Sequence, residues 1–141
     1  MEIRELQPGY AVSPQIEPGD VAALAEAGFT TVICNRPDAE IPAEQGSQAI
    51  RHAVEAAGML FVDNPLSHGH LTEAIVDLQR ETLDGSPGPV FAYCASGNRC
   101  SILWALAEAG RQPTGVLIGA AGRWGYNLEP YRDQIEALAN G

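Results

Sequence analysis

The stretch VFAYCASGNRCSILWALA, residues 90–107, predicts a strand, a short loop and a helix in immediate succession. Its first four residues carry the apolar, β-branched and aromatic side chains that buried strands favour. From Ile102 to Ala107 apolar residues recur at helical spacing, and Gly110 predicts the helix end. Between strand and helix lies Cys-x-x-Gly-x-Arg, from Cys94 to Arg99. The cysteine is therefore expected at the carboxyl end of a buried strand.

The rest of the chain repeats this alternation of short apolar runs and amphipathic segments. Apolar runs predict strands at 30–34 and 59–62, and a shorter run predicts an edge strand at 10–12. Helices are predicted at 18–28, 50–58, 71–78, 113–122 and 128–139. Such alternation indicates an α/β domain spanning 1–141, with a mostly parallel sheet of about four to five strands and helices on both faces. Ligands of such sheets bind at the carboxyl ends of the strands.

Composition limits the classes of function. The net charge is −10, and all eight basic residues are arginine. This average field disfavours nucleic acid, and no apolar run is long enough for a membrane span. Three cysteines without a paired spacing predict neither a disulfide framework nor a metal site. The first residues lack a secretory signal. We expect a cytoplasmic protein that needs no metal or other cofactor.

The loop after the strand has the composition of an anion-binding turn. Backbone N–H groups in such a turn converge on one point, and the following helix adds the positive end of its dipole. Glycine and asparagine tolerate the required backbone angles, and Arg99 offers a forked pair of donors. This setting favours a Cys94 thiolate, to which Ser101 is expected to donate a hydrogen bond. The anion-binding loop is predicted to comprise Ala95, Ser96, Gly97 and Asn98, with Ser101 following.

The loop resembles those of two enzyme families that use a cysteine nucleophile. Protein tyrosine and dual-specificity phosphatases carry Cys-x5-Arg, around a phosphoryl group. Rhodanese-type sulfurtransferases commonly carry Cys-x4-Arg, around the terminal sulfur of a persulfide. This chain has Cys94-x4-Arg99, and position 100 is a second cysteine. The loop length therefore favours sulfur chemistry.

The scaffold resembles a bacterial phosphatase-like domain of unknown function. The resemblance rests on SPQIEPGDVAALAEAGFTTVICNRPDAE, AAGMLFVDNPL and YCASGNRCSILWALA, which cover most of residues 10–110. That domain occurs alone or fused to metallo-β-lactamase-like persulfide dioxygenases. The resemblance implies a dual-specificity-phosphatase-like fold and a role in persulfide handling, with a dioxygenase as a potential partner in trans.

Several other residues are candidates for accessory roles. Phosphatases protonate the leaving group with an aspartate on a loop before the cysteine strand, whereas NPLSHGH, residues 64–70, has none. His68 or His70 could replace it, or could simply be solvated. Arg36 could attract an anionic substrate or pair with a nearby carboxylate.

The remaining two cysteines receive separate predictions. Some dual-specificity phosphatases place a "backdoor" cysteine at a neighbouring strand end, and Cys34 resembles it, which implies a resolving thiol for Cys94. A small buried side chain is the alternative. Cys100 is expected to face away from the loop and to serve in packing.

Three functions follow from these observations. The leading prediction is a sulfurtransferase that forms a persulfide on Cys94 and passes sulfur from thiosulfate or a persulfide to a thiol or cyanide. The alternative is a phosphatase in which Cys94 is the nucleophile and Arg99 binds phosphate. The third is a module that senses an anion or persulfide without turnover. The expected partner in each case is a small sulfur donor or anion.

Overall fold

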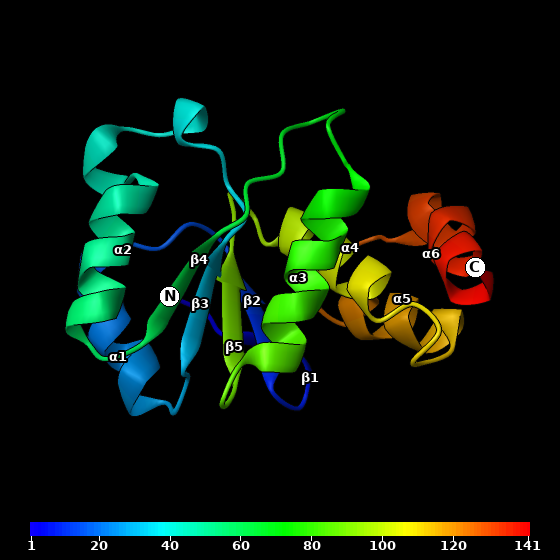
Figure 1. The fold of residues 1–141 in the computed structure, drawn as a ribbon, viewed down its shortest axis with the longest axis horizontal. Coiled ribbons are helices and arrows are strands. Elements are labelled where there is room, and N and C mark those ends of the chain that lie inside the picture. The colour runs from blue at the N-terminus through cyan, green and yellow to red at the C-terminus, as the bar shows by residue number, and fades with distance from the viewer.

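The computed structural model describes residues 1–141 as a five-stranded sheet flanked by helices (Figure 1). The strand order is β1-β2-β5-β3-β4, and every pairing is parallel except that of β1 with β2. The strands are β1 (Arg4–Gln7), β2 (Tyr10–Ser13), β3 (Thr31–Cys34), β4 (Leu60–Asp63) and β5 (Val90–Tyr93). The α-helices are α1 (Val21–Glu26), α2 (Ser47–Ala56), α3 (Glu73–Gly85), α4 (Asn98–Ala107), α5 (Thr114–Gly122) and α6 (Arg132–Asn140). The α/β class and the mostly parallel sheet are thus confirmed.

The edge of the sheet differs from the prediction. The strand predicted at 10–12 is an interior strand, because β1 pairs with it in antiparallel register, with Arg4 opposite Val12. The β1 segment RELQ carries two charged residues and has no apolar run that would predict a strand. The segment adopts a strand conformation because it pairs with β2, which satisfies the hydrogen-bonding groups of its backbone.

The two faces of the sheet carry separate cores. In Figure 1, α1 and α2 cover one face, whereas α3 to α6 lie on the other. The first face packs Val32, Cys34, Phe91 and Tyr93 against α1 and α2. The second packs the alternate strand residues, together with Cys94, against a helix α4 that is buried from Arg99 to Ala107. Successive strand residues point to opposite faces, so Tyr93 and Cys94 belong to different cores.

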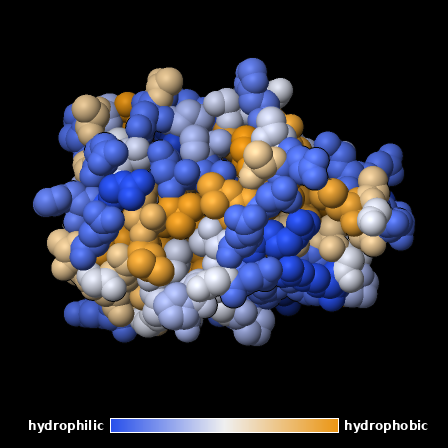
Figure 2. Space-filling view, in the orientation of Figure 1, coloured by the Kyte–Doolittle hydropathy of each residue, from blue (hydrophilic) through white to orange (hydrophobic).

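The opposite edge strand, β4, is partly open to solvent. Its Leu60 is exposed, although the apolar run predicted burial. Figure 2 shows apolar residues crossing the middle of the molecule in the view of Figure 1, between hydrophilic residues that cover most of the rest.

Helix α3 begins later than predicted. Thr72 is its N-cap, because its side chain accepts a hydrogen bond from the N–H of Ile75. Within the helix Ala74 is exposed, whereas Val76 and Gln79 are buried. The buried face is therefore rotated by about one residue from the predicted face, and Leu71 and Ile75 still pack against the core.

A buried polar network ties the sheet to α3 and α4. Asn35 donates to Gln79 at 3.0 Å and to the Asn64 carbonyl at 2.8 Å. Gln79 donates to the Tyr10 hydroxyl at 3.2 Å, which in turn donates to the Cys100 carbonyl at 2.9 Å. Gln79 has no exposed surface, so these bonds replace its lost hydration. None of the helices α1 to α6 combines the length and the apolar composition that a membrane-spanning helix requires.

Candidate active site

The Cys94 loop lies at the carboxyl end of the central strand β5. Cys94 follows Tyr93 directly, and α4 begins at Asn98. Gly97 between them has φ of +94°, in the left-handed region that favours glycine. A β-carbon at Gly97 would also collide with the Tyr126 hydroxyl. Two independent constraints thus require glycine at this turn, which aims the loop N–H groups at Cys94.

These groups strongly favour the Cys94 thiolate. The Gly97 N–H donates to Cys94 Sγ at 3.1 Å. The pKa of Cys94 is lowered from its ordinary 9.0 to about 5 by hydrogen bonding from the Cys100 thiol, followed by the backbone N–H groups of Cys100, Ser96 and Gly97; burial opposes the shift. Cys94 has no exposed surface, so hydrogen bonds rather than water stabilise the charge. The predicted thiolate environment is present.

Two residues near the loop have roles other than those predicted. Cys100 was expected to face away, but its thiol lies against Cys94, and burial beside that sulfur raises the pKa of Cys100 well above its ordinary value. The reason is that α4 is buried on all sides, so its first turn has no outward face. Ser101 donates to the Gly97 carbonyl at 2.8 Å and not to the thiolate. It closes the first turn of α4 and fixes the loop backbone.

Arg99 lies beside Cys94 and is held by a carboxylate. Its two terminal nitrogens donate to Glu40 at 2.8 and 2.9 Å, and Nη1 also donates to the Leu66 carbonyl at 2.9 Å. Hydrogen bonding to Arg99 is the main cause that lowers the pKa of Glu40. The side chain of Arg99 is only 8% exposed. This ion pair fixes the orientation of the Arg99 guanidinium next to the thiolate.

Arg36 takes the second of its predicted roles. It pairs with Glu40 at 3.4 Å and donates to the Gln15 side chain at 3.2 Å. Glu40 therefore lies between two arginines, one from the loop after β3 and one from the Cys94 loop. The sequence contained no signal for the Glu40 and Arg99 pair, because 59 residues separate them.

The structure does not place Cys34 as a partner of Cys94. Strand register pairs Cys34 with Tyr93, so both side chains occupy the sheet face opposite to Cys94. Cys34 Sγ instead donates to the Arg36 carbonyl at 3.3 Å, and burial raises the pKa of Cys34 to about 11. None of the three cysteines forms a disulfide. The buried-side-chain alternative describes Cys34 better than the resolving thiol does.

Tyr126 supports the loop from the far end of the chain. Its hydroxyl donates to the Ser96 carbonyl at 2.7 Å and accepts from Arg4 Nη1 at 2.7 Å. It thus joins β1, the Cys94 loop and the segment after α5. A lone tyrosine in a turn carries no functional pattern, so the sequence alone does not place Tyr126.

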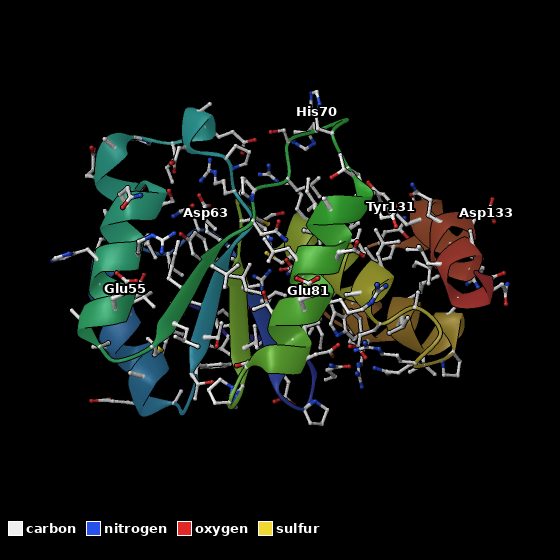
Figure 3. The ribbon with its side chains drawn as sticks, in the orientation of Figure 1. Glu55, Asp63, His70, Glu81, Tyr131 and Asp133 are labelled. Carbon is white, nitrogen blue, oxygen red and sulfur yellow. The ribbon has the colours of Figure 1, made fainter.

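A pocket of about 290 Å³ opens beside Arg99. Asn98 and Arg99 form one wall, and His68 reaches its rim from the loop between β4 and α3. Figure 3 shows His70 at the outer tip of that loop, pointing away from the body of the domain. Of the two histidines considered, only His68 lines this pocket. No group of three His, Cys, Asp or Glu side chains gathers anywhere in the chain to hold a metal ion.

A parallel-sheet domain with a buried cysteine thiolate, an arginine and a glycine turn at a strand end has the architecture of cysteine-dependent phosphatases. Solved structures agree. A protein from Neisseria meningitidis described as a candidate phosphatase is 32% identical, with a TM-score of 0.84 over 98% of this chain and 99% of its own. Tk-PTP and TpbA of P. aeruginosa share the fold, with TM-scores of 0.72 and 0.67 and identities of 15% and 18%. They cover 98% and 99% of this chain, and 96% and 83% of their own.

Residues 2–111 match the phosphatase-like domain of beta-lactamase hydrolase-like proteins, and the chain belongs to this family. The beta-lactamase hydrolase-like protein of Agrobacterium fabrum is 37% identical over 90 residues, which is 64% of this chain and 21% of that protein. The Xylella fastidiosa relative is 30% identical over 108 residues, 77% of this chain and 25% of its own length. The chain thus spans a quarter or less of these relatives. The family and the fold are phosphatase-like, and neither supports the predicted sulfurtransferase.

Proposed function

We propose that this domain is a cysteine-dependent phosphatase that hydrolyses small phosphate monoesters. The observation that carries the proposal is the Cys94 thiolate, whose pKa is lowered to about 5 beside the guanidinium of Arg99. A thiolate is the nucleophile that such enzymes require, and a fixed arginine next to it stabilises the charge on the phosphoryl oxygens. The phosphatase-like fold and family support this assignment.

The proposed reaction has two steps. Cys94 Sγ attacks phosphorus, the bond from phosphorus to the ester oxygen breaks, and His68 donates a proton to the departing oxygen. Water then attacks the phosphocysteine, which releases phosphate and restores the thiolate. During both steps the N–H groups of the loop and the free donors of Arg99 hold the phosphoryl oxygens. His68 is chosen over His70 because it lines the pocket beside Arg99.

Release of phosphate from an aryl phosphate tests this proposal. Wild-type protein should release phosphate, and Cys94→Ser should lose at least about a thousandfold in rate, since a hydroxyl lacks the thiolate's nucleophilicity. His68→Ala should lower kcat more for a poor leaving group than for a good one, and His70→Ala is the matched control. Full activity in Cys94→Ser would overturn the proposal.

Sulfur transfer is a second candidate, favoured by one specific observation. The loop is Cys94-x4-Arg99, one residue shorter than the phosphatase loop described above, and Cys94 is fully buried within it. A persulfide needs less room than a phosphoryl group. Intact mass spectrometry after incubation with thiosulfate separates the two: a gain of one sulfur atom on Cys94, reversed by a thiol and absent in Cys94→Ser, would favour sulfur transfer. A persulfide dioxygenase acting in trans would fit that candidate.

A further inference from the structure

One peptide unit of the Cys94 loop carries hydrogen bonds on both of its sides. Its carbonyl, from Ser96, accepts from the Tyr126 hydroxyl at 2.7 Å. Its N–H, from Gly97, donates to Cys94 Sγ at 3.1 Å. A trans peptide is planar, so its C=O and its N–H point in opposite directions. A group that holds this carbonyl on the outside of the loop therefore also directs the N–H at the sulfur inside it.

The loop itself leaves this peptide unit a choice of orientation. Turning the unit over would change mainly ψ of Ser96 and φ of Gly97, and glycine adopts positive and negative φ about equally well. Gly97 has φ of +94°, and the contact with Tyr126 favours this orientation over the reversed one. A β-carbon on Gly97 would collide with the Tyr126 hydroxyl. The glycine that permits either orientation is thus also the residue that lets the hydroxyl approach and select one.

Arg4 determines that Tyr126 is the donor in this contact. Arg4 Nη1 donates to the Tyr126 oxygen at 2.7 Å, and a guanidinium has no acceptor. The Tyr126 proton is therefore directed at the Ser96 carbonyl. Burial is the main cause that raises the pKa of Tyr126, so the hydroxyl keeps this proton at neutral pH. A charged donor on the tyrosine oxygen also polarises the O–H group and strengthens the hydrogen bond that it donates.

We propose that Tyr126 is a positioning residue for the Cys94 nucleophile and that Arg4 directs it, because together they turn the Gly97 N–H toward the sulfur. Neither side chain donates a hydrogen bond to Cys94, so both act through the backbone of the loop. Arg4 lies in β1, whereas Tyr126 follows α5, beyond residue 111 where the match to the family model ends. The segment after the matched part thus takes part in preparing the nucleophile.

Other charged and titratable groups also face Cys94 and stay in place when Tyr126 is changed. The Cys100 thiol and the Arg99 guanidinium come from α4, and the Tyr10 hydroxyl comes from β2. Loss of the Tyr126 hydroxyl should therefore weaken one of several interactions with the thiolate. We expect it to raise the pKa of Cys94 by about 1 unit, from about 5 to about 6.

Alkylation of Cys94 by iodoacetamide at a series of pH values, followed by mass spectrometry of the full chain, measures this pKa without any substrate. Tyr126→Phe removes only the oxygen, and its rate at pH 5 should be about fivefold below that of wild type. Arg4→Met keeps the hydroxyl and should raise the midpoint by about half a unit. Tyr93→Phe is the matched control, because Tyr93 directly precedes Cys94 but its hydroxyl lies in the core on the other sheet face, without a hydrogen-bond partner. Its midpoint should equal that of wild type.

An unchanged midpoint in folded Tyr126→Phe or Arg4→Met, or an equal rise in Tyr93→Phe, would overturn the positioning role. The unfolding temperature of each variant identifies loss of fold, and Arg4→Met decides the question if Tyr126→Phe does not fold. The measurement needs no turnover, so it is independent of the proposed function. A raised midpoint in Tyr126→Phe and Arg4→Met alone, in a protein that releases no phosphate from any aryl phosphate, would uphold the positioning role and overturn the proposed phosphatase.

Discussion

Replacing Cys100 by alanine should raise the pKa of Cys94. The lowering from 9.0 to about 5 corresponds to about 5 kcal/mol in favour of the thiolate. The hydrogen bond from the Cys100 thiol makes the largest contribution to this lowering of the Cys94 pKa. A hydrogen bond to a charged group contributes about 1.5–3 kcal/mol, so its loss should raise the pKa by about 1–2 units, to about 6–7. Cys100→Ser keeps a donor at the same place and should remain near the wild-type value.

The rate of Cys94 alkylation by iodoacetamide, followed by mass spectrometry from pH 4 to about 9, measures this pKa. At pH 6 the rate in Cys100→Ala should fall by about two- to tenfold, because less thiolate is present. At pH 9 the difference should largely vanish. Identical midpoints in wild type and Cys100→Ala would refute the role of the Cys100 thiol, and would assign the low pKa to the backbone N–H groups alone.

The same shift makes the stability of the domain depend on pH. Because the pKa of Cys94 is lower in the folded protein than in the unfolded chain, the thiolate's contribution is complete above about pH 9. It declines as the pH falls and is lost on passing below about pH 5. Wild type should therefore lose more stability than Cys94→Ser between pH 9 and 5, as urea unfolding at several pH values would measure.

Two further substitutions probe the frame around the loop. Gly97→Ala should cost about 1–3 kcal/mol of folding free energy in backbone strain and should abolish rapid alkylation of Cys94. Gly28→Ala is the control: Gly28 also has positive φ (+98°) but open space around it, so this variant should lose stability alone. Rapid alkylation of folded Gly97→Ala would contradict this reasoning. Gln79→Leu should lower the free energy of unfolding by about 3 kcal/mol, because it leaves the buried side chains of Asn35 and Asn64 without their hydrogen-bond partner. An unchanged midpoint of urea unfolding would show that this polar network contributes little to stability.

Local patterns were sufficient to predict most of the elements. Runs of β-branched residues predict buried strands, amphipathic segments predict helices, and a glycine after an apolar helical stretch predicts the end of the helix. These patterns involve residues close together in the sequence, so they were enough to predict the α/β class, the parallel strands and most helices. The Cys94 loop could be predicted in the same way, since the strand, the glycine turn and the helix follow one another directly in the sequence. The β1 strand was not, because its extended conformation depends on pairing with β2.

The sequence by itself determined that a cysteine, a glycine and an arginine would meet at the carboxyl end of a buried strand, because chain geometry over six residues leaves little choice. Only the tertiary structure decided what surrounds them. Glu40 holds Arg99, and Tyr126 holds the loop, through contacts between segments that are 59 and 30 residues apart. The face to which Cys34 points depends on strand register, and the direction of the Cys100 thiol depends on how α4 is buried. Such pairings arise when elements pack, and no pattern of neighbouring residues encodes them.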